Sequence, residues 1–243
     1  MNFFKSIVFS KFFSLIKSWK KPYVDFSQLG EEKIIHNILI RISSKFKIHQ
    51  HYIDIGGFHP ILHSNTYKLY QKGWSGIIIE PNPNKTKFWN SIRPRDLIIN
   101  SALVPYNFNK KEIKIYKNED NDPTESVILK NENNIHQNYF SKTIKIPEIL
   151  SVCEKNSIKP FFLNIDIEGF EDEIILDLAH WNYKIPLICV ELVLKNTSEN
   201  FSIFNYKNFE SVKFLEKNGY FLVSVCGISL IFCHNDYWIP YHR

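Results

Sequence analysis

The sequence predicts an α/β domain built on a mostly parallel sheet with an antiparallel edge, and three observations predict it. Short apolar stretches typical of strands alternate with stretches in which apolar residues recur at helical spacing. Several of these strands are apolar throughout, which is typical of parallel strands covered by helices on both faces. The last two apolar stretches, 220–225 and 229–233, are separated by a short turn containing Cys226 and Gly227. This spacing favours an antiparallel pair at the edge.

The elements can be justified in chain order. A helix is predicted from Ile34 to Phe46, because Ile38 and Ile42 continue an apolar face at every fourth residue. Pro81 is expected to end the second strand, with Pro83 close behind. The remaining pattern predicts strands at 51–55, 76–80, 96–104, 112–117, 161–167 and 186–192, and helices around 64–72, 147–156, 170–179 and 208–217.

The N-terminal 21 residues alternate apolar pairs with Lys or Ser. They contain no apolar run of membrane-spanning length and no small-residue cleavage site, so neither a membrane span nor a signal peptide is predicted. Their lysines predict a basic amphipathic helix. It either packs on its own domain or on a partner subunit of a homo-oligomer, which is the favoured interpretation, or lies on an anionic membrane surface. We expect a helical extension over 1–45 and the main domain over 46–243.

The composition of the chain indicates which kinds of partner it can bind and in which cellular compartment it functions. The formal charge of +5 is compatible with anionic small molecules or membrane surfaces. The chain has no Lys/Arg run with interleaved aromatics, so no nucleic-acid partner is expected. Its four cysteines form no CxxC pair, and two of them lie within apolar runs. This pattern favours a reducing cytoplasm over a disulfide framework or a zinc site.

Carboxylates fall at the ends of four predicted strands. Ligands of doubly wound sheets bind outside the carboxyl ends of the strands. A helix cap or a surface charge would explain one acid there, but four at corresponding positions predict a site. These acids are Asp54, Glu80, Asp166 with Glu168, and Glu191.

The stretch YIDIGGFHP (52–60) predicts what this site binds. Glu80 lies 26 residues beyond Asp54, much as an acid that binds ribose hydroxyls follows the glycines of dinucleotide sites. However, Gly56-Gly57 lacks the G-x-G-x-x-G pattern, and Pro60 interrupts the position where a pyrophosphate-binding helix would begin. A nucleoside without phosphates therefore fits better, as in S-adenosylmethionine sites. An NAD(P)-dependent oxidoreductase is the alternative.

Four blocks of the sequence also resemble a known family. The stretch YIDIGGFHPILHSNTYKLYQKGWSGIIIEPNP (52–83) resembles the first cofactor motif of the FkbM-type methyltransferases, and 27–32, 162–176 and 227–238 resemble further blocks. The resemblance implies a class I methyltransferase (Rossmann-like) fold with a seven-stranded sheet. It also implies S-adenosylmethionine as cofactor and O-methylation of a sugar or a related hydroxyl.

The resemblance assigns roles to cofactor-site residues. Asp54, Gly56 and Gly57 would line the methionine end of the cofactor, and Glu80 would bind the ribose. One departure concerns the turn, where Gly57-Phe58 replaces the usual Ala-Asn and removes a polar side chain. The remaining implied contacts are Asn82, Asn100 and Ser101 near the ribose and adenine, with Gln28 closing from the N-terminal side.

Methyl transfer to a hydroxyl calls for a general base or a metal. Asp166 is the first candidate base, and Glu168 lies on the same side if the strand continues that far. The two could share a proton or hold a divalent ion; alternatively, Asp166 only orders the turn before Gly169. His59 is the second candidate base, because a neutral imidazole suits pH 7. Its alternative role is a hydrogen bond to the loop backbone.

Further polar residues are candidates for binding the acceptor. They follow the glycine turn, and one of them, Ser64, is alternatively a cap of the next helix. The candidate acceptor contacts are His63, Ser64, Asn65 and Thr66.

The polar segment 118–138, which includes Glu125, is predicted as a long loop that either closes over the acceptor or is a surface excursion.

These observations favour an S-adenosylmethionine-dependent O-methyltransferase acting on a carbohydrate. The resemblance to the family implies that the acceptor is a sugar nucleotide or glycan of capsule or lipopolysaccharide biosynthesis. The expected location is the cytoplasm or the inner face of the membrane. A second alternative is a non-catalytic, membrane-associated scaffold with a methyltransferase-like fold, built around residues 1–21.

Overall fold

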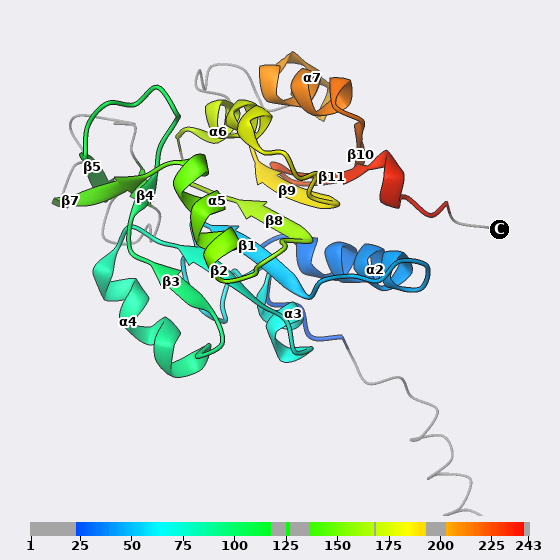
Figure 1. Ribbon diagram of the computed structural model, residues 1–243, viewed down its shortest axis with the longest axis horizontal. Helices are drawn as coiled ribbons and strands as arrows, with labels where there is room; N and C mark the ends of the chain where they lie inside the picture. The colour runs from blue at the N-terminus through cyan, green and yellow to red at the C-terminus, as the bar shows by residue number, and fades with distance from the viewer. Residues whose placement is uncertain (1–22, 118–124, 127–136, 168, 193–202, 241–243) are drawn as a thin grey trace, which may run out of the picture.

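The structure is a computed structural model that describes residues 23–117, 125–126, 137–167, 169–192 and 203–240 (Figure 1). Its main sheet has seven strands in the order β10-β11-β9-β8-β1-β2-β3. This sheet confirms the predicted α/β class with a mostly parallel sheet and an antiparallel edge. The strands are β1 (His51–Ile55), β2 (Ser75–Ile79), β3 (Leu97–Ile99), β8 (Phe162–Ile165), β9 (Leu187–Glu191), β10 (Tyr220–Cys226) and β11 (Ser229–His234).

Strand order places a ligand crevice at β1. This strand pairs in parallel with β2 on one side and with β8 on the other. From β1 the chain first builds outward through β2 and β3, and later returns to build β8 and β9 on the opposite side. The carboxyl ends of β1 and β8 therefore flank a topological switch point, where open α/β sheets bind ligands.

Helices cover both faces of the main sheet. Neighbouring side chains on a strand point to opposite faces, so Tyr52 joins one buried apolar cluster and Ile53 the other. The Tyr52 cluster includes buried residues of α2 (Glu31–Ser43), α3 (Tyr67–Gln71) and α4 (Pro83–Ile92). The Ile53 cluster includes residues of α5 (Ile146–Lys155), α6 (Glu171–Asp177) and α7 (Glu210–Lys217).

Helix α2 belongs to the core of the main domain. Its apolar face, predicted from the spacing of isoleucines, buries Ile35, Ile38 and Ile42 against the same cluster as β1. The amphipathic segment predicted at 1–21 lies outside the described residues, and the proposed boundary between 45 and 46 stays a prediction. Within the described residues, no helix combines the length and the apolarity needed to cross a membrane.

A second, four-stranded sheet has the order β4-β7-β5-β6 and lies beside the main one, at the opposite end of the molecule from α2 (Figure 1). The predicted strand 96–104 is divided, because its second half leaves the main sheet and pairs with β7. Strand β7 itself begins within the predicted loop 118–138, most of which lies outside the described residues. The four strands are β4 (Ala102–Leu103), β5 (Glu112–Lys117), β6 (Glu125–Ser126) and β7 (Gln137–Ile144).

Helix α4 is absent from the sequence prediction, which treated the two prolines after β2 as breakers. Pro83 instead occupies the first helical position, where the missing N–H costs nothing. The Asn82 side chain accepts a hydrogen bond from the Asn84 N–H and caps the helix. Within the part of the chain that the structure describes, short 3-10 helices also occur at Leu178–His180, Ile203–Asn208 and Asn235–Tyr237.

Candidate functional site

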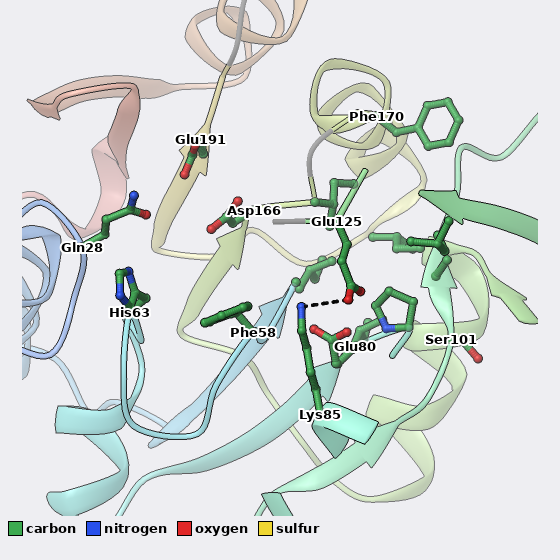
Figure 2. Close-up of a pocket in the computed structure, with 18 residues that line it drawn as sticks. Gln28, Phe58, His63, Glu80, Lys85, Ser101, Glu125, Asp166, Phe170 and Glu191 are labelled. Atoms are coloured by element: carbon green, nitrogen blue, oxygen red, sulfur yellow. Dashed lines mark ion pairs between the residues drawn. The ribbon is translucent and has the colours of Figure 1, made fainter. Parts of the chain in front are cut away.

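A cavity of about 350 Å³ opens at the carboxyl edge of the main sheet. The ends of β1, β2, β8 and β9 line it, together with residues 101–103 and the side chains of Ile115 and Glu125 from the small sheet. In Figure 2, Gln28, His63 and Glu191 lie on one side of the cavity, Glu80 and Ser101 on the other, and Asp166 between them. The volume is within the range of small-molecule sites.

Gly56 forms the floor of the cavity. Its φ of 81° lies in the left-handed region, and its N–H donates to the carbonyl of Ile79 at 2.9 Å. The neighbouring Gly57 does not line the cavity: a Cβ there would lie 2.6 Å from Ile78 Cγ2 and 3.0 Å from the Trp89 ring. Gly56 thus brings backbone to the cavity surface, whereas Gly57 permits close packing behind it.

The carboxylate of Asp54 lies behind the cavity wall rather than in it. It is buried and accepts hydrogen bonds from the Thr66 hydroxyl and, at 2.9 Å, from the Asn164 amide. These bonds tie β1 to β8 and to the loop before α3. Asp54 therefore braces the turn that carries Gly56, and it is not among the residues that line the cavity.

Glu80 presents a buried carboxyl group to the cavity, and only 3 % of the residue is exposed. Its Oε1 accepts the Asn82 N–H at 2.8 Å. Burial raises the pKa of Glu80 to about 8 against the lowering influence of Lys85, so the group is largely protonated at neutral pH. The Asn100 amide donates to the carbonyls of Glu80 and Pro81 at 2.9 and 3.0 Å and braces this turn.

Glu125 fastens the small sheet to this side of the cavity. Its carboxylate accepts the Asn82 side-chain amide and the Tyr139 hydroxyl, each at 2.7 Å, and lies 3.5 Å from Lys85 Nζ (Figure 2). The Lys85 ammonium also sits 4.4 Å from the centroid of the Phe58 ring. Sequence reasoning placed Glu125 in a loop and missed Lys85 and Tyr139, because no local pattern links residues this far apart.

His59 is engaged with its own loop. Its Nδ1 accepts the backbone N–H groups of Ile61 and Leu62, both at 3.0 Å, and the residue is not among those lining the cavity. Burial lowers the pKa of His59, and the charge of His63 lowers it further. The geometry therefore favours the loop-bracing interpretation of His59. His63 does line the cavity.

The three polar residues after His63 divide between two environments. The Ser64 hydroxyl accepts the N–H of Tyr67, the first residue of α3, at 3.1 Å, although the N-cap residue of this helix is Thr66. The Thr66 hydroxyl is buried and donates to Asp54. Asn65 borders a small recess beside the main cavity. Of the three, Asn65 is therefore placed to meet a ligand.

Arg93 is a buried support that sequence reasoning missed. Its Nε pairs with Asp96 at 2.7 Å, and its Nη2 donates to the hydroxyls of Tyr52 at 2.6 Å and Thr66 at 3.1 Å. The guanidinium carbon also lies 4.5 Å from the Trp89 ring. Through Thr66, this network holds Asp54. An arginine within a polar stretch resembles a surface residue, so the sequence carries no signal for it.

Asp166 and Glu191 reach the cavity from β8 and β9. The Asp166 N–H donates to the Ile55 carbonyl at 2.9 Å, which fixes the strand end. Glu168, the predicted partner of Asp166, lies outside the described residues. Among the residues that the structure describes, no three His, Cys, Asp or Glu side chains are grouped as metal ligands.

The predicted site residues therefore fall into two groups. The first lines the cavity or its recess: Gln28, Gly56, His63, Asn65, Glu80, Ser101 and Asp166. The second supports the wall from behind: Asp54, Gly57, His59, Ser64, Thr66, Asn82 and Asn100.

Comparison with known proteins agrees with this geometry. A family model described as the methyltransferase FkbM domain matches residues 54–222, from the end of β1 to the first residues of β10. A comparison with curated proteins found no significant match.

Proposed function

We propose that this chain, which belongs to the FkbM methyltransferase family and is therefore a methyltransferase, transfers a methyl group from S-adenosylmethionine to a carbohydrate hydroxyl. One observation carries the choice of cofactor. The turn after β1 brings Gly56 backbone to the cavity floor without a phosphate-binding helix, and the buried Glu80 stands at the end of the next strand. That combination suits a nucleoside without phosphates.

The residues present fit this cofactor. In the proposal, Glu80 binds the ribose hydroxyls, and the apolar side chains of Ala102, Leu103 and Ile115 pack on the adenine. Asn82 and Asn100 hold the turn that carries Glu80. Gly56 lets the turn after β1 approach the Asp166 backbone closely, and the methionine part is proposed to lie over this floor.

Bound S-adenosylmethionine would supply an activated methyl group on a sulfonium. The protein's task is then to align an acceptor hydroxyl with that methyl group and to accept the hydroxyl proton. Alignment of two reactants contributes as much as about 7–11 kcal/mol in favourable cases. Asp166 is the proposed base, because it lies in the cavity between the Glu80 side and the Gln28 side (Figure 2).

The proposed acceptor is a sugar hydroxyl, carried by a glycan or a sugar nucleotide of capsule or lipopolysaccharide biosynthesis. The resemblance to the family supports the carbohydrate. A location in the cytoplasm or at the inner face of the membrane is proposed from the free cysteines and the basic segment 1–21. The same segment is the proposed contact with an anionic membrane or with a second subunit.

Titration calorimetry tests the cofactor. We expect binding of S-adenosylhomocysteine by the full-length protein and loss of most of that affinity in Glu80→Ala. Binding of NAD without S-adenosylhomocysteine binding would overturn the proposal. Mass spectrometry of reactions with S-adenosylmethionine and a panel of sugars, sugar nucleotides and glycans then identifies the acceptor by its gain of one methyl group.

A further inference from the structure

A recess of about 10 Å³ adjoins the cavity on the side away from Glu80. Cavity and recess share Gln28, His63, Asp166 and Glu191 as lining residues, so the recess opens from the site already described. Its volume is close to that of one water-sized group. Asn65 lines the recess but not the main cavity.

A chain of hydrogen bonds that starts at the buried Asp54 sets the orientation of the Asn65 amide. The Asp54 carboxylate can only accept, so Asn164 must turn its Nδ2 toward Asp54, at 2.9 Å. Asn164 Oδ1 is then the acceptor for Asn65 Nδ2, also at 2.9 Å. Rotating either amide by half a turn would bring two oxygens together. The charge of Asp54 therefore determines which atom of the Asn65 amide is left without a hydrogen-bond partner.

The Asn65 amide atom that is left without a partner is the oxygen. Asn65 Oδ1 is buried, and it has no hydrogen-bond partner among the described residues. A buried acceptor without a donor is costly, by about 1–3 kcal/mol. A ligand group that enters the recess must therefore be a hydrogen-bond donor. The recess is also bordered by the carboxylates of Asp166 and Glu191, which favour a cation over a neutral hydroxyl.

We propose that Asn65 Oδ1 accepts a hydrogen bond from the α-ammonium group of the methyl donor. This inference rests on the proposed function and adds a residue that recognises the amino-acid end of the cofactor. With the nucleoside at Glu80 and Ser101, the amino-acid end extends past Gly56 toward Gln28 and His63, where the recess lies (Figure 2). A primary ammonium has the size, the donor character and the charge that the recess requires.

The test compares two ligands that differ only in this group. S-adenosylhomocysteine and its deamino analogue, in which hydrogen replaces the amino group, are titrated into the full-length wild type and into Asn65→Leu, which keeps the side-chain shape. We expect the wild type to prefer S-adenosylhomocysteine by roughly ten- to a hundredfold, the range for a hydrogen bond to a charged group. In Asn65→Leu the preference should fall at least about tenfold.

The outcomes separate the possible failures. If Asn65 only supports the fold, its substitution weakens both ligands equally and the preference is unchanged, which overturns the inference. Equal binding of both ligands by the wild type overturns it without any variant. If the wild type binds neither ligand, the proposed function fails as well. Asn156→Leu, which removes an exposed amide at the end of α5, is the matched control and should leave the preference unchanged.

Discussion

The carbonyl oxygen of Asp166 occupies the space that a side chain on residue 56 would need: a Cβ added to Gly56 would lie 1.6 Å from it. The turn after β1 and the end of β8 are thus in backbone contact, and this contact forms the cavity floor. Glycine is required here for two separate reasons. Its backbone has a left-handed φ of 81°, and the Asp166 carbonyl leaves no room for a Cβ.

Gly56→Ala should abolish binding of S-adenosylhomocysteine and lower the free energy of unfolding by several kcal/mol. The left-handed backbone accounts for about 1–2 kcal/mol of this loss, and the forced separation of β1 from β8 accounts for the rest. Urea denaturation and calorimetry measure the two effects.

Gly73→Ala is the matched control for Gly56→Ala. Gly73 has a similar φ of 95°, but a Cβ there would have no atom within 4 Å. Its substitution should cost about 1–2 kcal/mol of stability and leave ligand binding intact. Equal losses in the two variants would show that the contact with Asp166 is unimportant.

The raised pKa of Glu80 predicts how stability depends on pH. Its pKa is about 8 in the folded chain, against an ordinary value of 4.5. Between these values the unfolded chain releases a proton that the folded chain retains, so the free energy of unfolding falls as pH rises from about 4.5 to 8. Glu80→Gln should remove this component and be more stable than the wild type near pH 8.

Urea denaturation from pH 5 to pH 9 measures this difference. Glu112→Gln, a change at an exposed glutamate of β5, should keep the wild-type pH dependence. If Glu80→Gln and the wild type lose stability in parallel across this range, Glu80 is ionised in the folded protein and the interpretation is wrong.

Two ion pairs of equal length should contribute differently to the free energy of unfolding, because one is buried and the other is exposed. Arg93–Asp96 and Lys213–Glu210 both have N–O distances of 2.7 Å, but the first pair is fully buried and the second is more than half exposed. Arg93→Met leaves a buried carboxylate without its partner and should cost about 3–5 kcal/mol of unfolding free energy. Lys213→Met should cost less than about 1 kcal/mol. Similar losses from both would refute the role assigned to the buried network.

The bracing role of His59 predicts that asparagine can replace it. Asparagine Oδ1 takes nearly the position of histidine Nδ1 and can accept the N–H groups of Ile61 and Leu62. His59→Asn should keep methyl transfer within about threefold of the wild type, whereas His59→Ala loses thermal stability. Asp166→Asn should lose most activity. If His59→Asn is as inactive as Asp166→Asn, His59 is the base instead.

Much of the fold could be predicted because its signals are local. The apolar runs of β1, β2, β8 and β9 and the isoleucine spacing of α2 depend on residues close in sequence. Helix α4 was missed because Pro83 breaks a helix interior but favours a helix start, and only the cap at Asn82 distinguishes the two. Strand β7 was missed because its polar sequence becomes a strand only by pairing with β5 and β4.

By itself, the sequence determined that carboxylates and glycines gather at one edge of a parallel sheet, because strands and turns are encoded by neighbouring residues. Only the tertiary structure decided which of them face the cavity. Asp54 and Glu80 both come at strand ends, yet Asp54 lies directly opposite Asn164 in the β1–β8 pairing and bonds to it, while Glu80 faces the open space. A side chain's role depends on what is packed beside it, and residues distant in sequence supply those neighbours.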